Sequence, residues 1–366
     1  MRLASYSLHV YRLPYERPVR WSDITEDAAQ FLLIRLVSDT GHTGVAEITI
    51  KPTWTGASLR GLAAALDDIF IPLLRTLDLS NPTAVRGHME GIPENHAAKA
   101  VIDNAIWDLN AMALGAPPWQ SWGGADTVPL SFTVTRQAPD RMAAEAVLMV
   151  ERYGFDTLKI KGGQGLVADV DAMRQLRAAL GSGTRLYVDA NGAYASAEAP
   201  EYVQAMADAG AEVVEDPCAL APDVAFTRLQ QACATPVLVD FGCWSPRDMR
   251  LFIAAGARAF SLKPGRFGLS DTLAMSRLAG AAGCRTLVGM FGESVLGTLT
   301  ALQLASTLPA GSLPAESTWF LAMTAQITHE PMTIKNGAIR LPATAGNAAL
   351  IDWKHPALST IQGDMT

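Results

Sequence analysis

The sequence predicts an α/β protein in which a barrel of alternating strands and helices follows a smaller α+β segment. From about residue 128 onward, short apolar segments alternate regularly with amphipathic ones, which is the pattern of parallel β/α units. Eight such apolar segments occur, and eight strands close a barrel of the TIM type. A doubly wound sheet is the alternative, but "GGQG" follows the second strand and lacks the GxGxxG spacing of a dinucleotide-binding loop.

The pattern of residues 1–127 predicts strands followed by helices. The segments "LASYSLHVYRL", "QFLLIRLVSD" and "TGVAEITI" alternate or are β-branched, and "SDTGHTG" joins the last two as a turn. In "HAAKAVIDNAIWDLNAMALG" apolar residues recur at helical spacing, and Gly115 with Pro117 marks the end of the helix. The Gly/Pro/Trp-rich stretch "APPWQSWGGADTVP" then indicates a domain boundary near residue 127.

The barrel is expected over residues 128–329. Its strands are predicted at "PLSFTV", "TLKIK", "RLYVDAN", "EVVEDP", "PVLVDFG", "AFSLKP", "TLVGM" and "LPAEST". The first clear helix between them places on one face Val167, Val170, Met173, Leu176 and Leu180. In residues 330–366 this alternation is lost, and "MTIKNGAIRLP" predicts a hairpin with its turn at Asn336 and Gly337. We expect this C-terminal segment to pack back on the N-terminal domain.

The composition excludes several classes of protein. The chain has 366 residues and a net charge of -7, and its Lys and Arg residues form no basic stripe, so we expect neither nucleic acid nor a membrane as a partner. The start lacks the apolar run of a signal peptide and no segment approaches a membrane span, which favours a cytoplasmic protein. Cys218, Cys233, Cys243 and Cys284 include no CxxC pair and predict reduced thiols.

Polar residues stand at the C-terminal ends of successive predicted strands, where barrel enzymes carry out their chemistry. In chain order they are Lys159, Lys161, Asp189, Asn191, Glu215, Asp240, Lys263, Glu293 and Glu316. The steps from Lys161 through Asp189, Glu215 and Asp240 to Lys263 are 28, 26, 25 and 23 residues, and each is the length of one β/α unit. These side chains are therefore expected to form a ring around one opening.

The three acids of this ring predict a metal site. Asp189, Glu215 and Asp240 on adjacent strands would repel one another strongly in a low-dielectric setting. A divalent cation would resolve this repulsion. Ligands that are all oxygen, with no His or Cys among them, favour Mg²⁺ over Zn²⁺.

Lysines flank the acids on both sides. Strand side chains alternate faces, so Lys159 and Lys161 point the same way, and a second ammonium group nearby makes it easier for Lys161 to give up its proton. Lys263 follows the acids in the ring. Bases on two faces of a metal-bound carboxylate indicate removal of the proton α to that carboxylate, with the metal stabilising the enediolate that forms.

Seven motifs occur in a characteristic order along the chain. They are "AVIDNAIWDLNAMALGAPPWQSWGG", "LKIKGG", "YVDANGAY", "VVEDP", "LVDFG", "FSLKPGRFGL" and "MFGESVLGTLTALQLA". Together they resemble the enolase superfamily, and within it the muconate-lactonizing-enzyme (muconate cycloisomerase) subgroup of the mandelate racemase/muconate lactonizing enzyme family. The likeness extends over nearly the whole chain, and the ordered set is specific although each motif alone is weak.

The resemblance implies an N-terminal α+β capping domain over a (β/α)7β TIM-like barrel. It implies one Mg²⁺ ion per subunit, held by Asp189, Glu215 and Asp240. It further implies that Lys161 and Lys263 form the acid/base pair, with Lys159 assisting. Family analogy also implies a homo-oligomer.

The sequence departs from the family's pattern in three places. The six histidines lie outside the predicted barrel strands, which argues against the mandelate-racemase subgroup, where a barrel histidine is one of the bases. Phe241 follows Asp240 where the family usually has an acidic residue, so the surroundings of Lys263 are expected to differ. "PAESTWF" lacks the aspartate motif of the dipeptide-epimerase relatives, which argues against a dipeptide as the substrate.

In this family, loops of the capping domain select the substrate, and "YERPVRW" and "IKPTWTG" are the candidates here. The expected substrate-binding residues are Asn191, Glu293, Trp54, Trp319, Glu316, Arg20 and Lys51. The basic side chains, together with Arg17, would bind an anionic tail. Alternatively, the two tryptophans would form a wall for a cation, with one of the glutamates supplying negative charge.

The predicted function is the Mg²⁺-dependent abstraction of a proton α to the carboxylate of a small molecule, for example an N-modified amino acid. Return of the proton on the other face gives a racemase or epimerase, which two flanking lysines suit best, and ring closure gives a cycloisomerase. A dehydratase is the runner-up on the same site. A Schiff-base aldolase also needs a strand lysine but has no use for three carboxylates. A non-catalytic barrel protein would be expected to have lost metal ligands, and none is missing.

Overall fold

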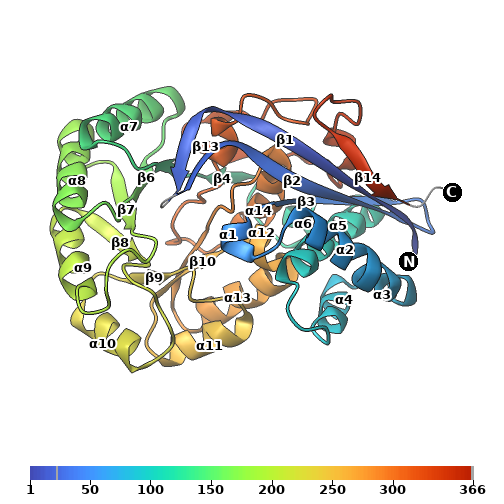
Figure 1. Ribbon diagram of the computed structural model, residues 1–366, viewed down its shortest axis with the longest axis horizontal. Helices are drawn as coiled ribbons and strands as arrows, with labels where there is room; N and C mark the ends of the chain where they lie inside the picture. Colours follow the sequence, from blue (N-terminus) through green and yellow to red (C-terminus); the bar gives the residue numbers. More distant parts are fainter. Residues whose placement is uncertain (22–23, 364–366) are drawn as a thin grey trace.

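The computed structural model describes residues 1–21 and 24–363 (Figure 1). Its N-terminal part contains a four-stranded antiparallel sheet in the order β14-β1-β2-β3. The strands are β1 (Leu3–Trp21), β2 (Ile24–Ser38), β3 (Thr43–Thr49) and β14 (Ser359–Gly363). The first three lie where the sequence predicts them. The fourth comes from the other end of the chain and pairs with β1, so both termini meet in one sheet.

Helices follow the first three strands, and the longest of them packs against this sheet. They are α1 (Pro52–Thr55), α2 (Leu59–Ala65), the π-helix η1 (Leu66–Phe70), α3 (Ile71–Thr76), α4 (Pro82–Met89), α5 (His96–Leu114) and α6 (Pro118–Ser121). As its spacing predicts, α5 buries Ala98, Ile102, Ala105 and Leu109 in the core shared with the sheet. Gly115 ends α5 in the left-handed conformation with φ 70°, which glycine adopts without strain.

Seven parallel strands follow one another in chain order around the barrel (Figure 1). They are β5 (Phe132–Val134), β6 (Thr157–Lys161), β7 (Arg185–Asp189), β8 (Ala211–Glu215), β9 (Val237–Val239), β10 (Ala259–Leu262) and β11 (Arg285–Val288). The helices that accompany them are α7 (Pro139–Tyr153), α8 (Leu166–Leu180), α9 (Ala199–Asp208), α10 (Val224–Ala232), α11 (Pro246–Ala254), α12 (Pro264–Phe267), α13 (Leu269–Ala281) and α14 (Val295–Ala305). Strand and helix therefore alternate as the sequence predicts.

The eighth place in the ring is taken by the segment "LPAEST", although it is not a regular strand. On one side, the backbone N–H groups of Leu313 and Glu316 donate to carbonyl groups of β11 at 3.0 and 2.8 Å. On the other side, Ser131 donates to the carbonyl of Ala315 at 2.8 Å, and Ala315 donates to Pro129 at 3.0 Å. These bonds join the last strand to the segment that leads into β5 and close the barrel.

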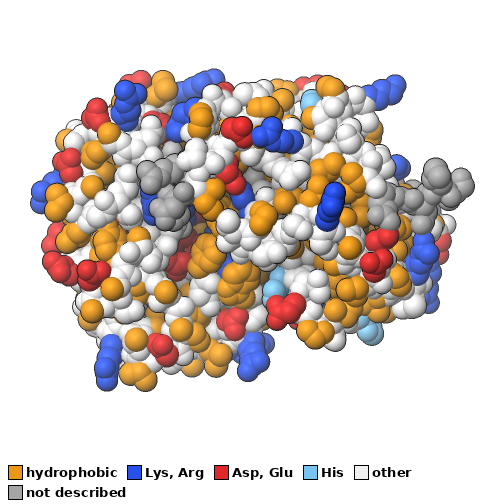
Figure 2. Space-filling view, in the orientation of Figure 1, with side chains coloured by type: hydrophobic (Ala, Val, Ile, Leu, Met, Phe, Trp, Pro, Cys, Tyr) orange, Lys and Arg blue, Asp and Glu red, His pale blue; other side chains and the backbone are white. Residues whose placement is uncertain are grey.

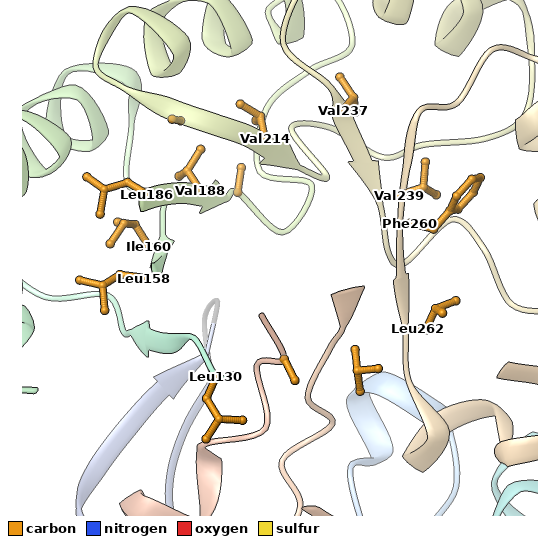
Figure 3. Packing of buried hydrophobic residues seen from close by; sticks show 14 of the residues in the cluster. Leu130, Leu158, Ile160, Leu186, Val188, Val214, Val237, Val239, Phe260 and Leu262 are labelled. Atoms are coloured by element: carbon orange, nitrogen blue, oxygen red, sulfur yellow. The ribbon is translucent and has the colours of Figure 1, made fainter. Parts of the chain in front are cut away.

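Strand residues alternate between the two faces of the barrel wall. One set belongs to the large core shared with the helices, and Figure 3 shows its labelled members on the outer side of the ring, among them Leu158, Ile160, Leu186, Val188 and Val214. The inward-facing apolar set is a separate cluster of Tyr187, Val213, Leu238, Ala259, Leu287 and Leu313. Lys159 is the register partner of Tyr187, so the lysines of β6 share the inner face.

Helix α8 turns the predicted face to the barrel, with Val167 as the exception. Met173 and Leu176 are buried and Val170 and Leu180 pack against the same core, whereas Val167 is 84% exposed. The buried carboxylate of Asp169 accepts a hydrogen bond from the backbone N–H of Gly163 at 2.6 Å. Asp169 thus holds the loop after β6.

The C-terminal segment divides between two neighbours. It contains the 3-10 helix η3 (Ala348–Leu350) and a hairpin of β12 (Ile334–Lys335) and β13 (Ala338–Arg340), with Asn336 and Gly337 at the predicted turn; the 3-10 helix η2 (Trp319–Ala322) precedes it. The hairpin pairs with β4 (Thr127–Pro129), at the entrance to the barrel. Farther along the tail, β14 pairs with β1, so that the end of the segment packs on the N-terminal domain as expected, whereas the hairpin pairs elsewhere.

Two further sequence expectations concern the surface and the cysteines. On the face shown in Figure 2, acidic and basic side chains are interspersed and form no continuous basic stripe. All four cysteines are free thiols. No helix in the described part of the chain is long and apolar enough to cross a membrane.

Candidate active site

The predicted ring of polar residues is present at the C-terminal ends of the strands. Strand register places Lys161 beside Asp189 and Asp189 beside Glu215 on β6, β7 and β8. Asp240 follows β9 directly, and Lys263 follows β10 directly. The acid-bearing strands β7, β8 and β9 therefore lie between the strands that carry the two lysines.

Lys159 lies at the centre of the acids. Its Nζ is 3.0 Å from Asp189 Oδ2, 2.6 Å from Glu215 Oε2 and 3.0 Å from Glu316 Oε1. Glu316 also accepts a hydrogen bond from the hydroxyl of Tyr187 at 2.8 Å, and both residues are buried. Glu316 therefore connects Lys159 to Tyr187 and fixes the position of the ammonium group.

Lys161 and Asn191 both contact Asp189. Lys161 Nζ is 2.6 Å from Asp189 Oδ2, the same oxygen that Lys159 reaches. Asn191 donates its backbone N–H to Asp189 Oδ1 at 2.8 Å and its side-chain amide to Oδ2 at 3.1 Å. The two neighbouring ammonium groups of β6 thus share one carboxylate, which compensates their charge.

Lys263 and Arg266 hold the third acid from two sides. Lys263 Nζ pairs with Asp240 Oδ2, and Arg266 Nη1 donates to Asp240 Oδ1 at 3.1 Å. The same guanidinium donates to the carbonyl of Cys243 at 3.0 Å and stacks 3.8 Å from the ring centre of Trp244. Arg266 was not among the predicted site residues, although "KPGRFG" places it three residues after Lys263.

Asp216 is a second residue that sequence reasoning missed. It follows Glu215 in "VVEDP", has a φ of 37°, and accepts backbone N–H bonds from Asp240 at 3.1 Å and Phe241 at 2.8 Å. Burial, together with the negative charges of Asp240 and Asp189, raises the pKa of Asp216 to about 7. The turn that follows β9 is therefore fixed from the neighbouring strand.

Burial and pairing act in opposite directions on the charges of the ring. Burial disfavours ionisation of Asp189, but the ammonium groups of Lys159 and Lys161 hold its pKa well below the usual range. Burial disfavours the charged form of Lys159 as well, yet Asp189, Glu215 and Glu316 raise its pKa well above the ordinary value. Burial and the neighbouring Asp189 raise the pKa of Glu215. The pair of Asp189 and Lys159 is thus held in its ionised form.

A cavity of about 260 Å³ opens above this ring. Its lining combines the ring residues with side chains of the surrounding loops: Ile24, Thr53, Trp54, Lys159, Lys161, Asn191, Asp240, Phe241, Lys263, Arg266, Met290, Phe291 and Glu316. The structure thus brings Trp54 of the N-terminal domain over the strand ends. Asn191 and Glu316 also reach the cavity, as predicted.

Three predicted substrate-binding residues lie outside the cavity lining. Trp319 is buried between the two domains, where its Nε1 donates to Tyr15 Oη at 3.2 Å. Glu293 turns away and accepts the backbone N–H of Phe291 at 2.6 Å. Lys51 is buried and paired with Glu26. In each case the side chain is engaged in packing or pairing, which the chain position alone does not reveal.

Two basic residues of the segment "YERPVRW", Arg17 and Arg20, were expected to bind an anionic tail of the substrate. Arg17 pairs with Glu145 of α7 at 2.7 Å, so it ties the loop to the barrel instead of facing the cavity. Arg20 belongs to β1, but its side chain lies outside the described part of the structure, so its predicted role remains a prediction.

Comparison with known proteins places the chain in a family. Residues 7–123 match "Mandelate racemase / muconate lactonizing enzyme, N-terminal domain", and residues 141–355 match "Enolase C-terminal domain-like". Among the relatives are muconate cycloisomerase 1-2 of Acinetobacter lwoffii, 29% identical over 96% of this chain and 94% of the relative, and the N-succinylamino acid racemase of Thermus thermophilus, 29% identical over 94% of each chain.

The fold agrees with solved structures of the same kind. One is the dipeptide epimerase from Cytophaga hutchinsonii complexed with Mg and the dipeptide D-Ala-L-Val, with a TM-score of 0.90, 25% identity and 99% of each chain covered. Both domains of this chain match, over more than half of its length in the barrel alone, and the curated relatives are isomerases. The chain therefore belongs to the mandelate racemase/muconate lactonizing enzyme family of the enolase superfamily and is an isomerase of that family.

Proposed function

We propose that this isomerase removes the proton α to the carboxylate of a small molecule in a Mg²⁺-dependent reaction and returns it, most simply as a racemase or epimerase. The placement of the two lysines carries this proposal. Lys161 is fixed against Asp189 and Lys263 against Asp240, with Glu215 between these acids in the ring. A substrate over the acids would have one ammonium-bearing side chain on each side.

The three acids fit a hard divalent cation, although they are paired with lysines here. In the described residues no three acidic, His or Cys side chains stand as a preformed ligand cluster. The buried Glu215 Oε1, however, has no hydrogen-bond partner. An unpartnered buried oxygen destabilises the fold unless a cation binds to it. Asp189, Glu215 and Asp240 offer only oxygen donors, the preference of Mg²⁺. A bound Mg²⁺ would supply the positive charge that stabilises the enediolate.

The side chains of the chain have distinct roles in this proposal. Lys161 Nζ takes the α-proton from one face of the substrate, and Lys263 Nζ delivers a proton to the other face, or the reverse for the opposite enantiomer. Lys159 is buried and bound to three carboxylates, so it acts as a fixed positive charge toward the substrate carboxylate. Asn191 orients Asp189 through two hydrogen bonds.

Cycloisomerisation is the second candidate, because relatives are named muconate and chloromuconate cycloisomerases. Ring closure and its reversal need the same proton transfer α to a carboxylate, so one of the two lysines suffices for that reaction. Dehydration on the same site remains the alternative outcome. The two-sided placement of Lys161 and Lys263 favours racemisation or epimerisation over both.

The test is a screen for exchange of the α-proton in D₂O, followed by mass shift, over carboxylates that include N-acyl amino acids and muconolactone. We expect exchange that EDTA abolishes and Mg²⁺ restores. Exchange that persists in EDTA would contradict the metal assignment. Trapping of a lysine adduct by borohydride would instead indicate Schiff-base chemistry, and no exchange with any carboxylate would contradict the proposed function.

A further inference from the structure

The cavity over the strand ends has two unlike halves. Its floor carries the charged side chains of the ring, whereas loops from both domains supply an apolar wall. The wall contains Trp54 from α1, Phe241 after β9, and Met290 and Phe291 after β11, with Ile24 beside them. The rings of Trp54 and Phe291 lie 5.5 Å apart, so the wall is continuous across the domain boundary.

The Phe241 side of this wall is held in place. Arg266 lies beneath it, with its guanidinium carbon 5.2 Å from the ring centre of Phe241 and 3.8 Å from that of Trp244. The same guanidinium donates to the backbone carbonyls of Asp240 at 3.3 Å and Cys243 at 3.0 Å, on both sides of Phe241. Phe241 is nevertheless 38% exposed. An ordered aromatic ring facing a cavity is a surface for an apolar group.

The charges of the site leave no acid for a cation on the substrate. The acids of the lining are Asp240, which is paired with Lys263 and Arg266, and Glu316, which is paired with Lys159 and bonded to Tyr187. At the rim, Glu26 pairs with Lys51 beneath Trp54. Among the residues that the structure describes, each acid that lines the cavity is therefore already engaged.

The balance of the whole ring points the same way. In its ion pairs, four acids (Asp189, Glu215, Asp240 and Glu316) meet four cations (Lys159, Lys161, Lys263 and Arg266). The two further acids, Asp216 and Glu293, accept backbone N–H groups and lie outside the cavity lining. A divalent cation added to the eight paired side chains gives this paired set a positive charge. An anionic substrate is attracted by such a site, and an ammonium group is repelled.

From these observations we propose that the site takes a carboxylate whose remaining part is uncharged and apolar or aromatic, and that it discriminates against substrates with an ammonium group. This inference rests on the proposed function and names its substrate class. The carboxylate lies over the charged floor, and the apolar part packs against Trp54, Phe241 and Phe291. The volume of about 260 Å³ is below the usual range of pockets for drug-sized ligands, about 300–1,000 Å³, so the substrate is small.

The test compares matched probes: N-acetyl-L-phenylalanine, which has an aromatic arm, N-acetyl-L-lysine, which has an ammonium arm, and free L-phenylalanine. Each is measured by calorimetric binding with Mg²⁺ present and, separately, by α-proton exchange in D₂O. We expect N-acetyl-L-phenylalanine to bind about tenfold or more tightly than either ammonium-bearing probe. Equal or tighter binding of N-acetyl-L-lysine or L-phenylalanine would overturn the inference.

A pair of variants locates the preference in the wall. Phe241→Glu adds a carboxylate and should raise the affinity for N-acetyl-L-lysine while lowering that for N-acetyl-L-phenylalanine. Phe241→Leu keeps the wall apolar and should preserve the order of the probes. Val167→Ala, on the exposed outer side of α8, is the matched control without effect. An unchanged preference in Phe241→Glu would contradict the role of this ring.

The two readouts separate this inference from the proposed function. If the aromatic probe binds in preference but no probe exchanges its α-proton, the substrate class stands and the proposed reaction is wrong. If exchange occurs and favours the ammonium-bearing probes, the reaction stands and the substrate class is wrong.

Discussion

Replacement of Lys159 by methionine removes a buried ammonium group and keeps the length of the side chain. Lys159 Nζ lies within 3.0 Å of Asp189, Glu215 and Glu316, and its side chain is 2% exposed. Removal of one partner of a buried ion pair costs about 3–5 kcal/mol, because a buried charge is left uncompensated. In a domain of about 150–250 residues each kcal/mol shifts the melting temperature by about 2–4 °C, so we expect Lys159→Met to lower it by about 6–20 °C.

The matched control is Lys161→Met. Lys161 is more exposed, at 12%, and its partner Asp189 keeps the contact with Lys159, so we expect a loss on the order of 1 kcal/mol. Both variants are unfolded by heat and by urea in EDTA, followed by circular dichroism. Added Mg²⁺ should recover more stability in Lys159→Met than in the parent, since the acids then lack one cation. Equal losses in the two variants, or no loss in Lys159→Met, would refute the assignment of Lys159 as the central counter-charge.

Three other predictions follow from buried contacts. Asp169→Asn should cost about 1–3 kcal/mol in urea unfolding, since its carboxylate accepts four hydrogen bonds and one amide oxygen does not satisfy four donors. Gly265→Ala should lower kcat/KM, because the new Cβ would lie 2.6 Å from Glu293 Oε1 in the turn that follows Lys263. Activity should return when Gly265→Ala is combined with Glu293→Ala. If it does not return, this clash is not the cause of the loss. Burial raises the pKa of Asp103 from 3.8 to about 7, so the folded state holds this proton more tightly than the unfolded state. The unfolding free energy should therefore fall as pH rises from about 4 to about 7, by at most about 4 kcal/mol from this group, and Asp103→Asn should flatten that part of the profile.

The positions of the ring residues could be predicted from the sequence because they depend on a repeating unit. Each β/α unit returns the chain to the same end of the barrel, so the spacing from Lys161 to Asp189 and Glu215 gives neighbouring places directly, and strand register confirms them. The same reasoning places Asp240 and Lys263 at the ends of β9 and β10. The positions of residues in a repeating unit can therefore be predicted from the sequence without knowledge of the tertiary contacts.

Side chains after the strand ends could not be predicted in this way, since their direction depends on local turns. Glu293 follows β11 as expected, but its carboxylate turns back to the N–H of Phe291. Trp319 lies only three residues after Glu316, yet it packs against Tyr15 of the other domain. Arg266 gains its importance from carbonyl groups and rings of a different loop. Such contacts join distant parts of the chain and leave no periodic pattern.

The partners of the three acids could not be predicted for a related reason. Three acids in register predicted a strong repulsion that a divalent cation would resolve. In the structure the lysines of the same ring and Arg266 already compensate them. The case for a cation depends instead on the unpartnered oxygen of Glu215 and the oxygen-only donor set.

In the proposed reaction, two lysines serve opposite faces of one substrate. The decisive measurement follows α-proton exchange in D₂O separately for each enantiomer of a substrate found in the exchange screen, with Lys161→Ala and with Lys263→Ala. Each variant should still exchange the proton of one enantiomer, a different one for each variant, and neither should convert one enantiomer into the other. Unchanged interconversion in either variant would exclude a two-base reaction of Lys161 and Lys263.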